Sequence, residues 1–328
     1  MPMPQPTAIT IGNFDGVHLG HVQLIQAAKQ AAGPDGRVVA LAFDPHPSAV
    51  LRPQSVPARL STWQQRSDWL RAAGASQVIQ LNPTRDFLNQ TAREFLASIV
   101  REYSPICIVE GPDFQFGKNR SGTVDTLREF EGEFNYRTII IPPIDAPLTD
   151  QSLVRVNSSM IRWLLVQGRV RDAAQLLGRP YELISMVARG DQRGRSIGVP
   201  TINLARPECL LPADGIYAGL ATLPGGPTFP AAISVGTKPT FGQHPRVCEA
   251  HLIDYEGPLD HYGWTVRLEF HEWIRDQLTY TGIDPLVRQL HRDIHRVKEV
   301  EFARAPENRP GASRTSQANA FAHPSMCV

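Results

Sequence analysis

The chain has 328 residues, 42% of them hydrophobic and 20% charged, and its 33 lysines and arginines against 32 aspartates and glutamates leave a formal net charge of +1. This length predicts two domains, and the charge gives no indication of a nucleic acid or a membrane as partner. The four cysteines show no C-x-x-C spacing, which argues against a disulfide or zinc framework. Because we find neither a signal peptide nor an apolar run of about 18 residues, we expect a cytoplasmic protein.

The first stretch that indicates chemistry is T-I-G-N-F-D-G-V-H-L-G-H at residues 10–21. An apolar strand pattern at residues 8–11 breaks into a glycine-rich turn, and a helical pattern follows. His18 and His21 are three residues apart in the first helical turn, so they share one side beside free N–H groups and the positive end of the helix dipole. Such a corner suits phosphate. For this spacing alone, a sharp turn with incidental histidines is the alternative.

The rest of the first half alternates between strand and helix patterns. Strands are predicted at residues 38–43, 77–81, 106–109 and 136–141, and helices at 63–73, 91–103, 123–130, 158–167 and 170–177. This alternation predicts a doubly wound parallel sheet, in which ligands bind at the carboxyl ends of the strands.

Three further loops of the first half carry polar or aromatic groups at such positions. F-D-P-H-P at residues 43–47 is either a rigid turn or part of a site. G-P-D-F-Q-F-G-K-N-R-S-G at 111–122 holds two phenylalanines that would contact a planar ligand, act as a lid or pack under the loop. In V-N-S-S-M-I-R at 156–162, Ser158 and Ser159 would cap a helix and offer donors to an anion, and Arg162 adds a cationic fork for phosphate.

The sequence pattern changes after Gly178, where glycine and proline end a helix. Short strand patterns at 183–188, 216–222, 231–235, 248–253 and 265–270 follow without intervening helices and predict a small antiparallel barrel or sandwich. A helix is expected at 285–300. Residues 303–328 lack periodicity and are expected to be a disordered tail.

A glycine-rich loop at residues 190–203 ends in Pro-Thr-Ile-Asn. The backbone amides around Gly190, Gly194 and Gly198 would wrap phosphates, and the oxygens of Thr201 and Asn203 are hard ligands that suit Mg²⁺. A cluster of β-turns is the alternative. Glu249 lies in a half-buried strand pattern, where an acidic residue is more often on the exposed face.

The complete pattern G-x-F-D-G-x-H-x-G-H resembles the signature of HxGH nucleotidyltransferases in the form that bacterial FAD synthetases use. The stretches F-x-P-H-P, G-x-D-F-x-F-G-x-x-R-x-G and S-S-T-x-I-R of that family have similar counterparts here, although Glu110 and Met160 depart from it. The resemblance implies a Rossmann-like domain with His18, His21 and Arg162 as catalytic residues. It also implies that ATP is bound by Gly12, Phe14, Asp15, Gly20, Ser158 and Ser159. The residues implied to face the flavin are Asp113 and Phe116.

The second half resembles riboflavin kinases, whose signatures are G-x-x-x-G-R-x-x-G-x-P-T-A-N and V-E-x-H-L-L-D-F. This resemblance implies a catalytic Glu249, a magnesium ion held by Thr201 and Asn203, and ATP bound around Gly190, Gly194 and Gly198. Ile202 and Lys238 depart from the family pattern.

The resemblance spans residues 7–300 and implies a bifunctional enzyme. Residues 179–302 would phosphorylate riboflavin to FMN with ATP, and residues 1–178 would adenylylate FMN to FAD. One alternative is a nucleotidyltransferase for another phosphorylated acceptor, which would leave Glu249 and the Pro-Thr-Ile-Asn stretch without a purpose. Another is a flavin-binding regulatory or storage protein with inactive sites. The sequence leaves self-association open.

Overall fold

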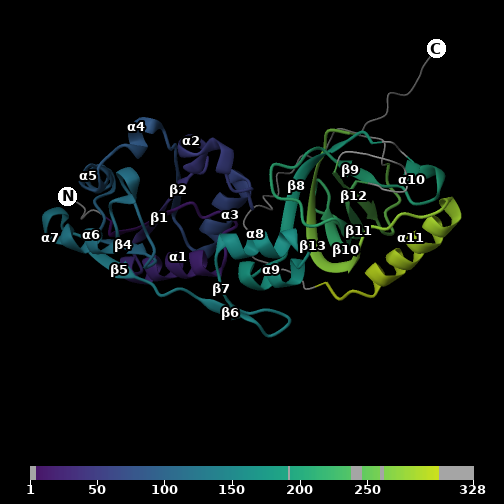
Figure 1. The fold of residues 1–328 in the computed structure, drawn as a ribbon. Coiled ribbons are helices and arrows are strands. Elements are labelled where there is room, and N and C mark those ends of the chain that lie inside the picture. Colours follow the sequence, from purple (N-terminus) through teal and green to yellow (C-terminus); the bar gives the residue numbers. More distant parts are fainter. Residues whose placement is uncertain (1–4, 191–192, 238–245, 259–261, 303–328) are drawn as a thin grey trace, which may run out of the picture.

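A parallel sheet forms the centre of the first half of the computed structural model, which describes residues 5–190, 193–237, 246–258 and 262–302 (Figure 1). Its five strands lie in the order β3-β2-β1-β4-β5. They are β1 (Thr7–Gly12), β2 (Arg37–Phe43), β3 (Gln77–Leu81), β4 (Cys107–Glu110) and β5 (Arg137–Ile140). The predicted doubly wound sheet is confirmed.

Helices cover both faces of this sheet because successive side chains of its strands point to opposite sides. Ala8 of β1 belongs to the same buried cluster as Ile25 of α1 (Leu19–Ala32) on one face. Ile9 belongs to a second cluster, with Phe95 of α5 (Ala92–Tyr103), on the other. The remaining helices of this half are α2 (Ser48–Leu51), η1 (Pro53–Ser55), α3 (Trp63–Ala73), α4 (Arg85–Leu88), η2 (Lys118–Arg120), α6 (Val124–Glu129) and α7 (Glu131–Phe134).

The second half is a closed barrel, with neighbouring strands antiparallel in the order β10-β11-β12-β9-β8-β13. The strands are β8 (Tyr181–Ala188), β9 (Ile202–Leu204), β10 (Gly215–Thr222), β11 (Thr228–Gly236), β12 (Val247–Leu252) and β13 (Thr265–Arg275). The short helix α10 (Arg193–Ser196) precedes β9, and α11 (Ile283–Lys298) packs on the barrel through the buried Val297. Of the barrel and sandwich alternatives, the barrel is therefore the one observed.

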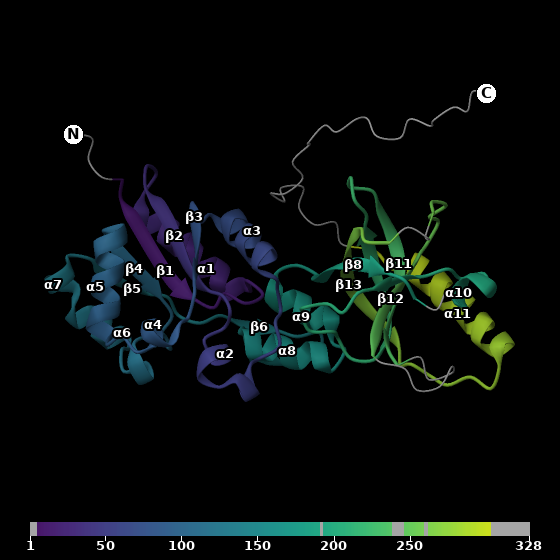
Figure 2. The same ribbon diagram turned by 90° about the horizontal axis from the view of Figure 1, so that it is seen from above.

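A hairpin and two helices connect the halves: β6 (Asp145–Pro147), β7 (Leu153–Arg155), α8 (Ser158–Val166) and α9 (Val170–Leu177). Both views place α8 and α9 between the sheet and the barrel (Figures 1 and 2). Leu164 and Leu176 of these helices belong to the same buried cluster as Leu183 and Phe270 of the barrel. The helices thus share a hydrophobic core with the barrel, and Gly178, at a φ of 71°, ends α9.

No helix among the described residues is long and apolar enough to cross a membrane. Cys107, Cys209 and Cys248 are buried free thiols. Two features raised by the sequence, Lys238 and the expected tail at 303–328, lie outside the described residues.

Candidate active sites

A cavity of about 280 Å³ lies at the carboxyl ends of β1, β4 and β5. The strand order places it where β1 has β2 on one side and β4 on the other, so the connections diverge there and leave room for a ligand. Six of the predicted site residues line the cavity: Gly12, Phe14, His18, Gly20, His21 and Asp113.

His18 and His21 stack on each other at the start of α1. Their rings stack with centroids 3.6 Å apart, and the edge of Phe14 packs against His21 at 5.1 Å. Burial, reinforced by the charge of Arg179, lowers the pKa of His18 to about 4, and burial beside His18 lowers the pKa of His21 well below its usual value. Both imidazoles are therefore neutral at pH 7. The Nδ1 atoms of both are buried without a hydrogen-bond partner among the described residues.

The loop before the histidines has an unusual backbone held by a buried carboxylate. Phe14 and Val17 have φ values of 48° and 39°, which side-chain-bearing residues rarely adopt. The Asp15 carboxylate accepts hydrogen bonds from the backbone N–H groups of Leu60 and Ser61 at 3.0–3.1 Å. Asp15, which was predicted to bind ATP, is not among the cavity-lining residues. Its carboxylate instead joins the loop to residues 60 and 61.

Arg162 completes this anchor. Its Nη2 donates to the Asp15 carboxylate at 2.6 Å, and its Nε donates to the Ala58 carbonyl at 2.6 Å. Arg162 is one turn into α8, whose first residue, Ser158, donates through its hydroxyl to the Asp15 carbonyl at 2.8 Å. The strained loop is therefore joined to α8 by two independent contacts.

The helix cap predicted for the serines belongs to another residue. Asn157, which has an extended backbone, is the N-cap of α8 and accepts from the Met160 N–H at 2.8 Å. The expectation that serine caps this helix was wrong, because Ser158 already has helical geometry and its hydroxyl bonds elsewhere. Ser159 is exposed, and Asn157 lines the cavity.

The two phenylalanines of the loop at 111–122 stack on each other with ring centroids 5.3 Å apart, but they differ in exposure. Phe114 lines the cavity, whereas Phe116, predicted to face the flavin, is only 7% exposed and packs 5.6 Å from Phe95 in the core. Reciprocal backbone hydrogen bonds between Phe116 and Gly122 draw Phe116 inward. The structure thus brings Phe114, not Phe116, to the cavity together with Asp113.

Two buried ionisable groups of this region were not predicted as site residues. Glu110 lines the cavity, and its Oε1 accepts from the Ile11 N–H at 2.6 Å; burial raises its pKa well above the usual value. An acidic residue at the end of an apolar strand was the available signal. Arg66 donates to the carbonyls of Asn13 and Phe43 at 3.0 and 2.8 Å, and no pattern in the sequence indicated it.

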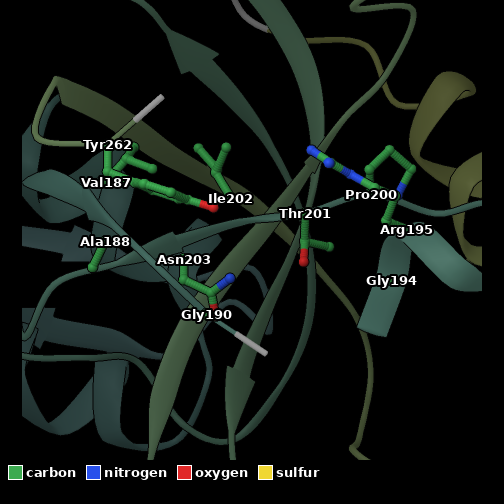
Figure 3. A pocket seen from close by; sticks show the side chains of 10 residues that line it. All are labelled: Val187, Ala188, Gly190, Gly194, Arg195, Pro200, Thr201, Ile202, Asn203 and Tyr262. Atoms are coloured by element: carbon green, nitrogen blue, oxygen red, sulfur yellow. The ribbon is translucent and has the colours of Figure 1, made fainter. Parts of the chain in front are cut away.

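A second, smaller cavity of about 20 Å³ lies in the barrel half, beside β9 (Figure 3). That volume holds about one water molecule or a single ion. Four of the predicted residues line it: Gly190, Gly194, Thr201 and Asn203. Gly198 is not among them, and its φ of 77° gives the loop a turn that favours glycine.

Close backbone approach explains Gly190 in this cavity. A Cβ atom at Gly190 would come within 2.2 Å of the Asn203 Nδ2. Figure 3 shows the side chains of Thr201, just before β9, and Asn203, on β9, projecting to the same side. Ile202, between them, is 1% exposed and packs into the barrel core, which accommodates the larger side chain where the family has alanine.

Glu249 does not line this cavity, but strand register places it beside Asn203, which does. Glu249 of β12 pairs directly with Asn203 of β9. Cross-strand neighbours in an antiparallel pair share a face with Cβ atoms about 5 Å apart. Strand β9 is only three residues long, and the sequence had assigned its residues to a loop. The structure thus places a carboxylate, a hydroxyl and an amide oxygen on one face of the barrel.

Comparisons with known proteins match both halves. Residues 1–153 match the family model described as FAD synthetase, and residues 177–301 match the one described as riboflavin kinase. A bifunctional riboflavin kinase/FMN adenylyltransferase of Haemophilus influenzae is 30% identical over 90% of this chain and 94% of its own length. The corresponding protein of Bacillus subtilis is 31% identical over 88% of this chain and 90% of its own length.

Among solved structures, a protein of Streptococcus pneumoniae described as a macrolide-efflux protein superposes with a TM-score of 0.81. It is 29% identical, and the alignment covers 92% of this chain and 96% of that one. The arrangement of sheet and barrel is therefore shared along nearly the whole chain. On these matches, the chain belongs to the family of bifunctional riboflavin kinases/FMN adenylyltransferases.

Proposed function

We propose that the 280 Å³ cavity is where FMN is adenylylated to FAD, and that the small barrel cavity with Glu249 is where riboflavin is phosphorylated to FMN. We divide the activities between residues 1–178 and residues 179–302. The observation that carries the first assignment is the pair of buried histidine Nδ1 atoms without partners at the cavity. Buried polar atoms normally have a partner, and a bound phosphate would supply it.

In the adenylylation step, a phosphate oxygen of FMN forms a bond to the α-phosphorus of ATP, and the bond to the β-phosphate oxygen breaks to release pyrophosphate. The nucleophile is already anionic, so the site needs to align it and stabilise charge rather than remove a proton. Neutral His18 and His21 each offer one N–H to the α-phosphate oxygens. The start of α1 adds the positive end of its dipole.

Two neighbouring groups have supporting roles in this proposal. Ser159 and the start of α8 would face the β- and γ-phosphates, with Arg162 adding positive charge one turn away. Asp113 and Phe114 border the cavity in the loop that follows β4 and would contact the flavin. Burial raises the pKa of Glu110, which disfavours a negative charge on this side of the cavity.

In the phosphorylation step, the primary hydroxyl of riboflavin attacks the γ-phosphorus of ATP and ADP leaves. We assign Glu249 as the base that receives the hydroxyl proton. A kinase also needs a divalent cation to screen the ATP phosphates. The oxygens of Thr201 and Asn203 fit Mg²⁺, which prefers hard oxygen ligands, and the glycine at 190 leaves room for the Asn203 amide.

The experiment incubates the protein with riboflavin, ATP and MgCl₂ and resolves the flavins by chromatography over time. We expect FMN first and FAD later, and FAD directly when FMN is supplied. FMN without FAD would contradict the assignment of the first cavity. FAD from supplied FMN without any product from riboflavin would contradict the assignment of the second.

A further inference from the structure

Arg179 lies in the short connection between α9 and β8, yet its guanidinium reaches the strained loop before α1. Its Nη1 donates to the Val17 carbonyl at 3.0 Å, and its Nη2 donates to the Gly16 carbonyl. The guanidinium also lies 3.5 Å from the ring centroid of Trp69 on α3. A connection between two parts of the chain thus contributes directly to the histidine loop.

The two carbonyls that Arg179 contacts belong to residues with positive φ. Gly16 and Val17 have φ values of 81° and 39°, and a β-branched residue keeps a positive φ only where its surroundings hold it. His18 follows immediately and is the N-cap of α1. A planar guanidinium can donate to two adjacent carbonyls at once, which an ammonium group does less well.

The barrel also reaches the histidine loop through a second series of hydrogen bonds. Tyr181, two residues after Arg179, donates through its hydroxyl to the Leu210 carbonyl at 2.7 Å. The Leu210 N–H in turn donates to the Arg59 carbonyl at 2.7 Å, and Arg59 precedes Leu60, whose N–H holds the Asp15 carboxylate. The barrel half therefore supports the histidine loop from both sides, through Arg179 and through residues 59–61.

We propose that Arg179 is a positioning residue for FMN adenylylation, which fixes the Gly16–Val17 backbone and so sets the position of His18 and His21 once the barrel is in place. The inference rests on the proposed role of the two histidines. Arg179 is not among the residues that line either cavity. Because its guanidinium donates to the loop before the histidines, we expect its substitution to affect the adenylylation step.

The test compares Arg179→Gln and Arg179→Lys in the full-length protein, with Arg171→Ala as the matched control. Arg171 is an arginine of α9 that also faces the barrel, 3.8 Å from Glu272, but does not reach the loop. We expect Arg179→Gln to lower kcat for FMN adenylylation at least about tenfold, as for the loss of a charged hydrogen bond, with KM for FMN nearly constant. Arg179→Lys should fall in between, and the control should match the wild type.

Riboflavin kinase activity reports folding in the same samples, and it should stay within about twofold of the wild type in all variants. Equal loss of both activities, or unchanged adenylylation in Arg179→Gln, would overturn the proposal.

A second readout does not depend on turnover. The pKa of His18 is measured by NMR of the ¹³C-histidine-labelled protein, with His18→Gln for assignment. The charges around His18 are Arg179 and Arg162, which lower its pKa, and Asp15, which raises it, and His21 stacks on it. Arg179→Gln should raise the pKa of His18, and Arg171→Ala should leave it at about 4. A pKa of His18 that Arg179→Gln does not change would show that Arg179 does not contact the loop in solution, and would overturn the proposal. Full adenylylation by His21→Ala would contradict the proposed catalytic role of the histidines. The NMR measurement would still show whether Arg179 contacts the loop in solution.

Discussion

The two candidate sites are held in place by different means. At the sheet, a cavity of about 280 Å³ is bordered by a loop with strained backbone, and that loop depends on contacts from α8 and the connection to the barrel. At the barrel, a cavity of about 20 Å³ is lined by the loop before β9 and by β9 itself, and strand pairing places Glu249 of β12 beside Asn203. The first site should therefore be sensitive to distant substitutions, whereas the second should respond to those beside its own strands.

The largest effect expected from this difference is that of Asp15→Ala. The substitution removes a buried acceptor of two backbone N–H groups and leaves Arg162 without its carboxylate. Loss of one partner of a buried ion pair costs about 3–5 kcal/mol, so we expect a corresponding fall in the free energy of unfolding, measured by urea denaturation, and loss of adenylylation. Asp125→Ala, at an exposed i,i+3 pair on α6, is the control. Full adenylylation by Asp15→Ala would show that the loop needs no such anchor.

The next effect concerns acid stability. The pKa of His18 is about 4 in the folded protein against 6.5 for an unperturbed histidine. Because the folded pKa is the lower one, the stability that depends on neutral His18 is complete above pH 6.5 and is lost as the pH falls towards 4. The shift corresponds to about 3 kcal/mol. Urea denaturation of wild type and His18→Asn between pH 7.5 and 4 should show the steeper loss in the wild type, and parallel curves would contradict the buried neutral imidazole.

A smaller and more local effect is expected for Gly190→Ala. The added methyl group would lie 2.2 Å from the Asn203 Nδ2 and displace that amide. Since the clash is with the end of a side chain, we expect little change in stability but a loss of riboflavin kinase activity of about tenfold. Gly282→Ala, whose added methyl group meets nothing closer than 3.9 Å, serves as control. Unchanged kinase kinetics in Gly190→Ala would remove Asn203 from the proposed magnesium site.

Most of the sheet could be predicted from the sequence because its strands β1, β2 and β4 are apolar and buried, and helices such as α3 and α5 carry clear start signals. The predicted strand 77–81 and helix 63–73 coincide with β3 and α3, and Thr91 with Glu94 forms a capping box at the start of α5, which was predicted at 91–103. Strand β9 escaped prediction because three residues are too few to show alternation, and its pairing with β8 and β12 comes from the barrel.

The candidate sites were predictable to the extent that a motif is contiguous. His18 and His21 lie in one such stretch, and the structure places both at the cavity. The contacts of Arg66 and Arg179 with the same loop join residues more than 50 positions apart, and no local pattern indicates them. Phe116 illustrates the converse, because a motif position does not reveal which of two neighbouring aromatic rings turns into the core.

The central claim is that two separate sets of residues carry the two activities. The most direct measurement is a chromatographic assay of flavin products from His21→Ala and Glu249→Gln, each given riboflavin or FMN with ATP and MgCl₂. We predict that His21→Ala converts riboflavin to FMN and makes no FAD, whereas Glu249→Gln makes no FMN but converts supplied FMN to FAD at the wild-type rate. Loss of both activities in either variant would contradict the account.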